Sequence, residues 1–376
     1  MVNKQQKELM ILVLNCGSSS LKYSLFRVIW IDNEKDFALI TSGLLECIGQ
    51  KDSPIRNHKQ AIKKVLGVLA QKNFSYRNIN AIGHRVVHGG EYFRKPTAIT
   101  SDVISKIKNC IKLAPLHNPA NLAGIEACKE LLSSVRQVAV FDTAFHQTIP
   151  PRAHLYAIPH KYYRKYNLRK FGFHGMSHQY VAREAAKKLG RSLHRLKLIT
   201  CHLGNGCSIC AVKYGKSLDT SMGFTPLAGL VMGTRSGDID PAAVLYIMQR
   251  EKLLPQEMQE ILNNQSGLKG VSGVSNDMRV LNRAAKKGNK RARIALRLFA
   301  YSIRKYIGSY MAVMGGVDAV VFTAGIGENV EIRKMISYGG LLSFLKKLNV
   351  KFFVIHTKEE LMIAHETYKI MGSKKR

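Results

Sequence analysis

The amino-acid sequence predicts an α/β fold built from two related domains. Short apolar strand patterns alternate with amphipathic helical patterns, strand pairs precede helices in both halves, and glycine turns stand at strand ends in both. The 376 residues exceed one simple core, since a domain has roughly 150 residues. We therefore expect two domains with a ligand-binding cleft between them.

The first half opens with a predicted β-hairpin. Residues 9–14 form an apolar run typical of a buried strand, Gly17 marks a tight turn, and residues 21–28 alternate as a second strand. Further patterns follow, with helices expected at 59–71 and 102–113 and strands at 79–87 and 137–141.

The second half repeats this order after Pro150 and Pro151, so a second domain is expected to begin near residue 145. Its predicted strands lie at 196–202, 207–213 and 319–323. Its predicted helices are long and lie at 241–263 and 275–314.

The charge balance is unusual for a globular chain. Lys and Arg number 58 against 25 Asp and Glu, a formal net charge of +33, whereas 46% hydrophobic and 22% charged residues are ordinary and exclude extensive disorder. Such a field attracts nucleic acid, anionic lipid or small phosphorylated metabolites, and charge alone does not select among them. We interpret the densest basic stretch, residues 283–304, as the solvated face of a helix.

The seven cysteines show no repeated spacing, so a disulfide framework is not expected. Cys207 and Cys210 form one CxxC, but no second pair follows at the spacing of a zinc site, and we interpret them as strand residues. The first apolar run stops at Asn15 without a cleavage site, and no stretch of about 20 apolar residues occurs. We expect a cytoplasmic protein that does not bind membranes.

A serine-rich turn at residues 15–22 joins the two strands of the predicted hairpin. Its three hydroxyls, its glycine backbone and Lys22 could cradle a phosphate, because backbone N–H groups and hydroxyls donate to phosphate oxygens. The P-loop spacing GxxxxGK is absent. A plain hairpin turn is the alternative interpretation.

Charged side chains stand at other strand ends. Arg85 lies in GHRVVHGG, where its guanidinium could grip a carboxylate or a phosphate, with a surface arginine as the alternative. Asp142 ends a strand, and His174 stands between glycines in FGFHGMSH, where imidazole can donate to developing charge. Four histidines lack the HExxH spacing, so no transition-metal site is expected at His146, His174, His178 and His202.

Three glycine loops stand in the second half, and the first and third of them follow predicted strands. They are HLGNG at 202–206, a loop at 233–241 with Arg235 between glycines and Pro241 opening a helix, and a strand-to-helix turn at 323–329. Backbone N–H groups at such turns favour anions. Together with the first-half motifs, these loops indicate a polyphosphate ligand.

The order of these motifs resembles the acetate kinase family of acetate, propionate and butyrate kinases. The matching motifs run from residue 11 to about 333 and resume at 357–367, and they include NxGSSSxK, GHRVVHGG, APLHNP, FDTAFH, FGFHGxSH, HLGNG, MGTRSGDIDP and FTAGIGEN. The resemblance implies two ribonuclease-H-like domains, as in sugar kinases, Hsp70 and actin. The expected domains are 1–144, with a C-terminal helix at 361–376 packing back on it, and a nucleotide-binding domain at 145–360.

The resemblance implies direct in-line transfer of the γ-phosphoryl group of Mg-ATP to acetate, giving acetyl phosphate and ADP. Arg85 and Arg235 would grip the carboxylate and the phosphoryl group, and His174 would donate to the phosphoryl oxygens. Asp142 would order the arginines or the nucleophile. The catalytic residues that this resemblance implies are Arg85, His117, Asp142, His174, Asn205 and Arg235.

The family motifs also assign ligand positions. Besides Arg85, the acyl group would contact Val87, Leu116, Phe173 and Pro226. Mg²⁺, with Mn²⁺ as the alternative ion, would be held by Asn15 and Glu359 directly or through water. The nucleotide would contact Ser18, Ser20, Lys22, His202, Leu203, Gly204, Asn205, Gly206, Asp277, Met278, Arg279, Gly325, Ile326, Gly327 and Asn329.

Acetate and ATP are thus the expected partners, in a homodimer as is usual for the family, and nucleic acid is not expected. A propionate or butyrate kinase is the nearest alternative, because one methylene is worth only about 1–3 kcal/mol in an apolar pocket. A degenerate, non-catalytic basic binding protein is the other. Only 27 residues separate Asn329 from Thr357, fewer than is usual in the family, so we expect a trimmed edge of the nucleotide domain at 330–356.

Overall fold

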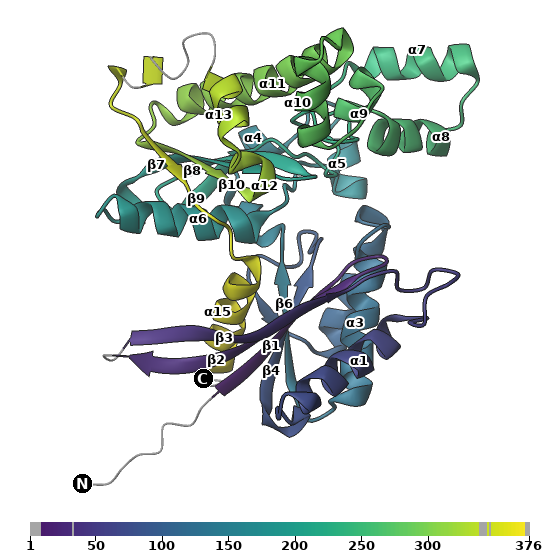
Figure 1. Cartoon of the computed structure of the whole chain (residues 1–376), viewed down its shortest axis with the longest axis vertical. Helices are drawn as coiled ribbons and strands as arrows, with labels where there is room; N and C mark the ends of the chain where they lie inside the picture. The colour runs from purple at the N-terminus through teal and green to yellow at the C-terminus, as the bar shows by residue number, and fades with distance from the viewer. Residues whose placement is uncertain (1–8, 32–33, 338–343, 346, 373–376) are drawn as a thin grey trace. The chain divides into compact units, whose positions relative to one another are not determined.

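The structure, a computed structural model, describes residues 9–31, 34–337, 344–345 and 347–372 and divides into two compact units (Figure 1). Unit 1 contains the chain up to Phe145 and again from Lys358 onward, and unit 2 runs from His146 to Thr357. Each unit has one β-sheet and its own helices. The predicted α/β class is therefore confirmed.

Unit 1 is built on a sheet in the order β3-β2-β1-β4-β6-β5. β1, β2 and β3 pair antiparallel, β4 and β6 add in parallel, and the short β5 closes the edge. The bounds are β1 Leu9–Cys16, β2 Leu21–Ile31, β3 Glu34–Leu45, β4 Ile79–Val86, β5 Thr97–Ala98 and β6 Arg136–Phe141. The predicted hairpin and the strands expected near 79 and 137 are confirmed, whereas β3 was not predicted.

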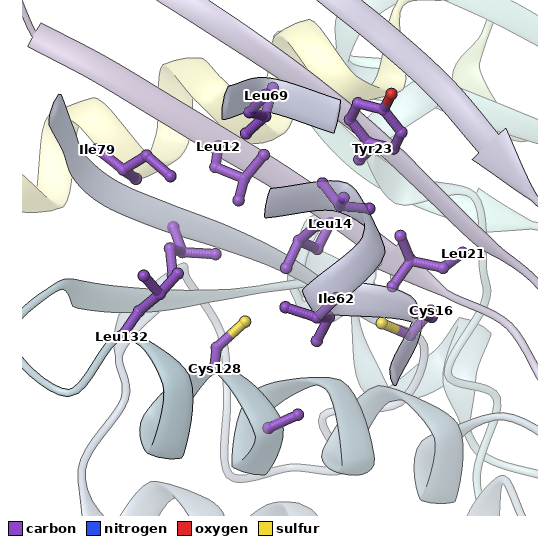
Figure 2. Packing of buried hydrophobic residues seen from close by; sticks show 14 of the residues in the cluster. Leu12, Leu14, Cys16, Leu21, Tyr23, Ile62, Leu69, Ile79, Cys128 and Leu132 are labelled. Atoms are coloured by element: carbon purple, nitrogen blue, oxygen red, sulfur yellow. The ribbon is translucent and has the colours of Figure 1, made fainter. Parts of the chain in front are cut away.

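Helices cover both faces of this sheet. α1 (His58–Gln71) and α3 (Asn118–Leu131) lie against one face and α15 (Glu359–Gly372) against the other, while α2 (Ser101–Asn109) packs on α3 (Figure 1). Because successive strand residues point to opposite faces, Leu12 and Leu14 of β1 join Ile62 and Cys128 in the core beneath α1 and α3 (Figure 2). α15 begins two residues before the helix expected at 361–376, whose last four residues lie outside the described chain.

Unit 2 repeats the topology of unit 1. Its sheet has the order β11-β10-β7-β8-β9, in which β7, β8 and β9 form an antiparallel meander and β10 and β11 add in parallel beside β7. The bounds are β7 Lys197–Leu203, β8 Cys207–Lys213, β9 Lys216–Thr220, β10 Ala319–Thr323 and β11 Lys351–Val354. Read from β9 to β11, this order and its strand directions match β3-β2-β1-β4-β6 of unit 1. The prediction of two related domains is therefore confirmed.

The helices of unit 2 surround this sheet, with α6 against one face and α11 against the other (Figure 1). Their bounds are α4 Pro151–His154, α5 Lys161–Tyr166, α6 Gly175–Lys188, α7 Pro241–Glu251, α8 Pro255–Glu260, α9 Gly267–Ser272, α10 Met278–Lys286, α11 Lys290–Met314, α12 Ala324–Gly327 and α13 Val330–Ser337. Among the residues with described positions, no helix is both long enough and apolar enough to cross a membrane.

The two long helices expected in unit 2 were wrong, since each is broken in two. The helix expected over 241–263 ends at α7 and restarts as α8, because Lys252 adopts a left-handed conformation and Pro255 cannot continue the hydrogen bonding. The helix expected over 275–314 is interrupted by Gly288 at φ +93°, after which Asn289 caps α11.

Two further expectations concern cysteines and the trimmed edge. Cys207 and Cys210 lie in β8 with buried thiols, which confirms them as strand residues. The segment 330–356 contributes α13 and the four-residue edge strand β11, but 338–343 and 346 fall outside the described residues.

The packing of α15 on β4 leads to a stability prediction. A β-carbon at Gly83 would lie 2.3 Å from Thr367 Oγ1 and 2.7 Å from Ile363 Cγ2 of α15. We expect Gly83→Ala to lower the free energy of unfolding by about 1–3 kcal/mol in urea titration, because the helix has to move. The control is Gly67→Ala in α1, where nothing lies within 4 Å; it should stabilise by about 0.5–1 kcal/mol. Equal effects of both variants would contradict this packing.

Candidate functional site

The centre of the unit 1 site is an ion pair between two neighbouring strands. Arg85 near the end of β4 donates from Nε to both carboxylate oxygens of Asp142 (3.1 and 3.2 Å) and from Nη2 to Oδ2 (2.6 Å). Asp142 directly follows β6, which pairs in parallel with β4. Both residues therefore lie at the carboxyl-terminal ends of neighbouring strands. The carboxylate is 2% exposed and the guanidinium 21%. This pair fixes one edge of Arg85 and leaves its Nη1 directed elsewhere.

The remaining end of Arg85 faces Asn15, and two further carboxylates act on it electrostatically. Its Nη1 lies 3.4 Å from Asn15 Oδ1 of β1. Burial alone would lower the pKa of Arg85, but the carboxylates of Asp142, Glu359 and Glu360 raise it above its ordinary value. Burial raises the pKa of Asp142, and the guanidinium opposes that shift. Asn15 and Glu359, the two residues expected to hold a cation, are thus both neighbours of Arg85.

The serine-rich turn is a tight loop tied to two helices. Gly17 N donates to Ser20 O (2.8 Å), and the Gly17 carbonyl is 2.8 Å from His58 Nε2 at the start of α1. Lys22 Nζ pairs with Glu360 of α15 (2.5 Å). The turn is therefore held at a defined position beside β1 and α15.

The four apolar residues expected around an acyl group fall in different units. In unit 1, Val87 is buried and its N–H donates to Asn121 Oδ1 (3.0 Å), whereas Leu116 is 63% exposed. In unit 2, Phe173 is buried, and the Pro226 carbonyl accepts a bond from Arg235 Nη1 (3.3 Å). No single unit contains the whole set.

The centre of the unit 2 site lies at the turn between β7 and β8. A β-carbon at Gly206 would lie 3.4 Å from Arg235 Nη1 and 3.4 Å from His174 Nε2, so both side chains reach the same point beside this glycine. A β-carbon at Gly233 would lie 3.0 Å from Asn205 Oδ1. His174, Asn205 and Arg235, which the sequence singled out, therefore lie close to this turn.

Arg235 differs from Arg85 in having no acid partner in the described part of the chain. Its bonds go to the Pro226 carbonyl and, at 3.8 Å, to the sulfur of Met232. Burial lowers the pKa of this half-buried guanidinium, and Cys207 acts in the opposite direction. A cation in this position favours an anionic ligand, because burial of an uncompensated charge is costly.

The histidines of unit 2 gather around α6. His174 occupies the N-cap position of this helix in the left-handed conformation (φ +56°), a strained backbone state that recurs at functional sites. The ring of His202 stacks on the ring of His174, with ring centroids 4.2 Å apart. Burial lowers the pKa of His146 to about 4, and burial with the charges of His146 and His202 lowers that of His178 well below its ordinary value.

The rings of His146 and His178 bond to hydroxyls and a carbonyl. His146 bonds Ser217 Oγ and the Phe173 carbonyl, and His178 bonds Thr200 and Ser208. Across the described ranges, no group of three or more His, Cys, Asp or Glu side chains is placed to hold a metal ion.

The expected nucleotide loops lie side by side in unit 2. A β-carbon at Gly204 would lie 3.7 Å from the side chain of Ala324, and one at Gly327 would lie 3.5 Å from Leu203, so the β7–β8 turn adjoins α12. Asn276, next to the Asp277–Arg279 stretch, lies 3.3 Å from a β-carbon built at Gly233.

Other expected nucleotide residues cap helices. Asp277 caps α10 by accepting from Arg279 N (2.7 Å) and pairs with the Arg279 guanidinium (2.8 Å). Asn329 Oδ1 accepts from the N–H groups of Glu331 and Ile332 at the start of α13. Both side chains therefore have structural roles that a nucleotide contact would add to.

Several residues at these sites carry no sequence signal that would have singled them out. Asn121 holds the backbone of Val87 and the Cys16 carbonyl, and Ser208 lies between two histidine rings. A buried Asn in a helix or a Ser in a strand looks ordinary in a sequence. Only Glu360, which follows Glu359, could have been found by adjacency.

Comparison with known proteins gives one consistent result. Residues 10–365 match the model of the acetokinase family. An acetate kinase of Thermoanaerobacterium thermosaccharolyticum is 51% identical over 406 aligned positions, covering 97% of this chain and 100% of that protein. The aligned length exceeds the whole of this chain, so the relative carries residues that this chain lacks.

Solved structures agree with this match. The structure of Porphyromonas gingivalis acetate kinase is 41% identical with a TM-score of 0.88, covering 96% of this chain and 100% of that one. A propionate kinase from Francisella tularensis is 43% identical with a TM-score of 0.83 and the same coverage. Together with the repeated sheet topology, these matches establish the fold as a pair of ribonuclease-H-like domains.

The ion pair of unit 1 leads to a second stability prediction. We expect Asp142→Asn to lower the free energy of unfolding by about 3 kcal/mol, because it leaves a largely buried guanidinium without its carboxylate. In the matched control, Asp102→Asn removes an exposed pair with Lys106 and should cost less than about 0.5 kcal/mol. Urea titration of both variants measures the difference. Equal losses would mean that the Arg85 pair contributes no more than a surface pair.

Proposed function

The chain belongs to the acetokinase family, and we propose that it is an acetate kinase, which transfers the γ-phosphoryl group of ATP reversibly to acetate and gives acetyl phosphate and ADP. The observation that carries the proposal is the half-buried guanidinium of Arg235, which lies beside His174 at Gly206 and has no carboxylate partner in the described residues. Phosphoryl transfer spreads charge over three equatorial oxygens. A guanidinium and an imidazole that reach one point are suited to stabilise that charge.

The proposed reaction needs positioning more than proton transfer. An acetate oxygen attacks the γ-phosphorus in line while the bond to the bridging oxygen of the β-phosphate breaks, and ADP leaves. The nucleophile is a carboxylate that is already ionised near neutral pH, so no general base is required. Asp142, bonded to two nitrogens of Arg85, therefore orders that arginine, whose Nη1 is left to grip the acetate carboxylate.

The proposed remaining roles follow the family motifs. His117, whose charge would lower the pKa of Asp142, and Asn205, next to Gly233, complete the phosphoryl site. Val87, Leu116, Phe173 and Pro226 surround the methyl group. The nucleotide contacts the turn at residues 18–22, the β7–β8 turn, the start of α10 and the loop at 325–329.

The proposed metal is Mg²⁺, held by Asn15 and Glu359 together with phosphate oxygens and water. The donor set fits this ion, because both residues offer oxygen and Mg²⁺ keeps several waters. Glu359 also acts electrostatically on Arg85 and Asp142, and within the described chain no hydrogen bond or ion pair engages its carboxylate. When bound, the ion would neutralise charge on the phosphates.

The experiment that tests the function is ATP-dependent acyl phosphate formation by the purified full chain. The product is trapped with hydroxylamine, and acetate, propionate and butyrate are compared with and without Mg²⁺. We expect turnover that requires Mg²⁺, with the highest kcat/KM for acetate. A higher value for propionate would indicate a propionate kinase instead. The sequence identities to the acetate and propionate kinase structures, 41% and 43%, favour neither substrate.

Folded protein without turnover in either direction would contradict an acetate kinase. If such protein also retained RNA at physiological salt, the alternative of a basic binding protein would replace this proposal, because the net charge of +33 favours polyanions.

The role of Arg235 leads to a kinetic prediction. We expect Arg235→Ala to lower kcat about 10²-fold, because it removes a donor that meets transition-state charge. Steady-state kinetics with acetate and ATP measure the change. The control is Arg195→Ala, an exposed arginine of unit 2, which should leave kcat unchanged. An unchanged kcat with a raised KM for Arg235→Ala would assign this residue to ground-state binding instead.

The proposed enzyme is a homodimer that buries α7. This helix contains no buried residue, and its apolar side chains Leu245 and Tyr246 are 59% and 58% exposed. An apolar helix face of this kind is typical of an interface between subunits.

This interface leads to a prediction on oligomeric state. We expect Leu245→Glu to give a monomer in size-exclusion chromatography with light scattering, because a charge on the buried face opposes association. Leu44→Glu is the control, since Leu44 is 54% exposed in β3 of unit 1 and should leave the dimer intact. A monomeric parent chain, or a dimeric Leu245→Glu variant, would contradict an interface at α7.

A further inference from the structure

A row of hydrogen bonds leads from His174 into the core of unit 2. His174 Nδ1 lies 2.8 Å from Ser208 Oγ, Ser208 Oγ lies 2.8 Å from His178 Nε2, and His178 Nδ1 lies 2.7 Å from Thr200 Oγ1. Thr200, His178 and Ser208 have no exposed surface. They come from β7, α6 and β8, so three elements meet in this row. We call these four residues the imidazole row.

Protons in the imidazole row have only two consistent arrangements. A neutral imidazole donates from one nitrogen and accepts at the other, and each hydroxyl has one proton. His178 is neutral, because burial lowers its pKa well below the ordinary value. Ser208 Oγ could also accept from both rings, but it has no third partner among the described residues, so its own proton would then be buried without an acceptor. The bonds therefore run either all toward His174 or all away from it.

The Thr200 end decides between the two directions. Over the described residues, His178 Nδ1 is the single hydrogen-bond partner of Thr200 Oγ1. If the bonds ran away from His174, Thr200 would accept from His178 and its own proton would be buried without an acceptor, which costs about 1–3 kcal/mol. If they run toward His174, the protons of Thr200, His178 and Ser208 all have acceptors.

We propose that Thr200, His178 and Ser208 hold His174 as the tautomer that carries its proton on Nε2. The Thr200 hydroxyl donates to His178 Nδ1, His178 Nε2–H donates to Ser208 Oγ, and the Ser208 hydroxyl donates to His174 Nδ1. Nδ1 therefore carries no proton, and the neutral ring donates from Nε2. This inference rests on the proposed function, in which His174 donates to the phosphoryl oxygens.

The orientation of His174 agrees with this assignment. Its Nε2 lies on the side of Gly206, at the point that Arg235 Nη1 also reaches. Arg235, His202 and His178 are the charged or titratable groups of unit 2 that these contacts place around the ring. A positive ring beside Arg235 would be repelled by it, which favours the neutral ring, and Nε2–H and Arg235 Nη1 would both donate to an anion bound at this point. Thr200, His178 and Ser208 are thus positioning residues that act through His174.

The test reads the tautomer directly. Full-length protein is labelled with ¹⁵N in its histidine rings, and long-range ¹H–¹⁵N correlation spectra are recorded above the ordinary imidazole pKa, with His174→Gln to assign the signals of His174 among the 13 histidines. We expect an unprotonated Nδ1 and a protonated Nε2 in the parent chain. A protonated Nδ1, or rapid exchange between both forms, would overturn the proposal.

A matched set of variants tests the cause. In Thr200→Val, either direction leaves one nitrogen of His178 unsatisfied, so the preference disappears; we expect both tautomers of His174 and a several-fold lower kcat at unchanged KM. Thr200→Ser restores the hydroxyl and should restore the parent spectrum. Thr220→Val removes another buried hydroxyl of the same sheet, bonded to the Ile209 carbonyl, and should leave the His174 signals unchanged.

The outcomes separate this proposal from the function it rests on. A parent spectrum retained in Thr200→Val would overturn the role of Thr200 even in an active enzyme. Because the spectra need no turnover, absence of acyl phosphate would count against the function and leave the tautomer measurable.

Discussion

The pairing of the buried Asp142 carboxylate with Arg85 is the interaction on which unit 1 depends. A carboxylate that is 2% exposed cannot remain charged without a cation, and this pair joins the ends of β4 and β6, which are neighbours in the sheet. The same guanidinium contacts Asn15 of β1. It also interacts electrostatically with Glu359 and Glu360 in the first turn of α15. One ion pair thus connects three strands and the helix that returns from the end of the chain.

Unit 2 has the same sheet order, but its Arg235 lacks, in the described part of the chain, the carboxylate partner that Arg85 has in unit 1. Arg235 is half-buried without an acid in the described residues, and the histidines beside it are kept neutral or oriented by hydroxyls rather than by carboxylates. The unit is therefore short of negative charge at one point, next to a glycine that leaves room there. A repeated topology with different charges is a direct way to give one unit a fixed arginine and the other an arginine that needs an anion.

Local patterns predicted those elements whose side chains repeat regularly. β1, β2, β4, β7, β8 and β10 are apolar runs or alternations bounded by glycine turns, and all were predicted near their observed bounds. α3 was not, because it is buried on most sides, including Asn118 and Asn121, and so lacks the polar face of an amphipathic helix. The two overlong helices were wrong because continuous amphipathic spacing outweighed the breaks at Gly288 and Pro255.

The sequence by itself determined the strands and turns, the residue types at the turns and, through the order of its motifs, the family. It did not determine which partner each of these side chains has. That Arg85 is neutralised by Asp142, 57 residues away, while Arg235 has no acid partner in the described chain, was decided by strand order. That a serine 34 residues from His174 and a threonine on the neighbouring strand set its hydrogen bonds was decided by the packing of α6 on the face of the sheet formed by β7 and β10, beside β8. Hydrogen bonds act over about 3 Å, so they report proximity in space, which local sequence patterns do not contain.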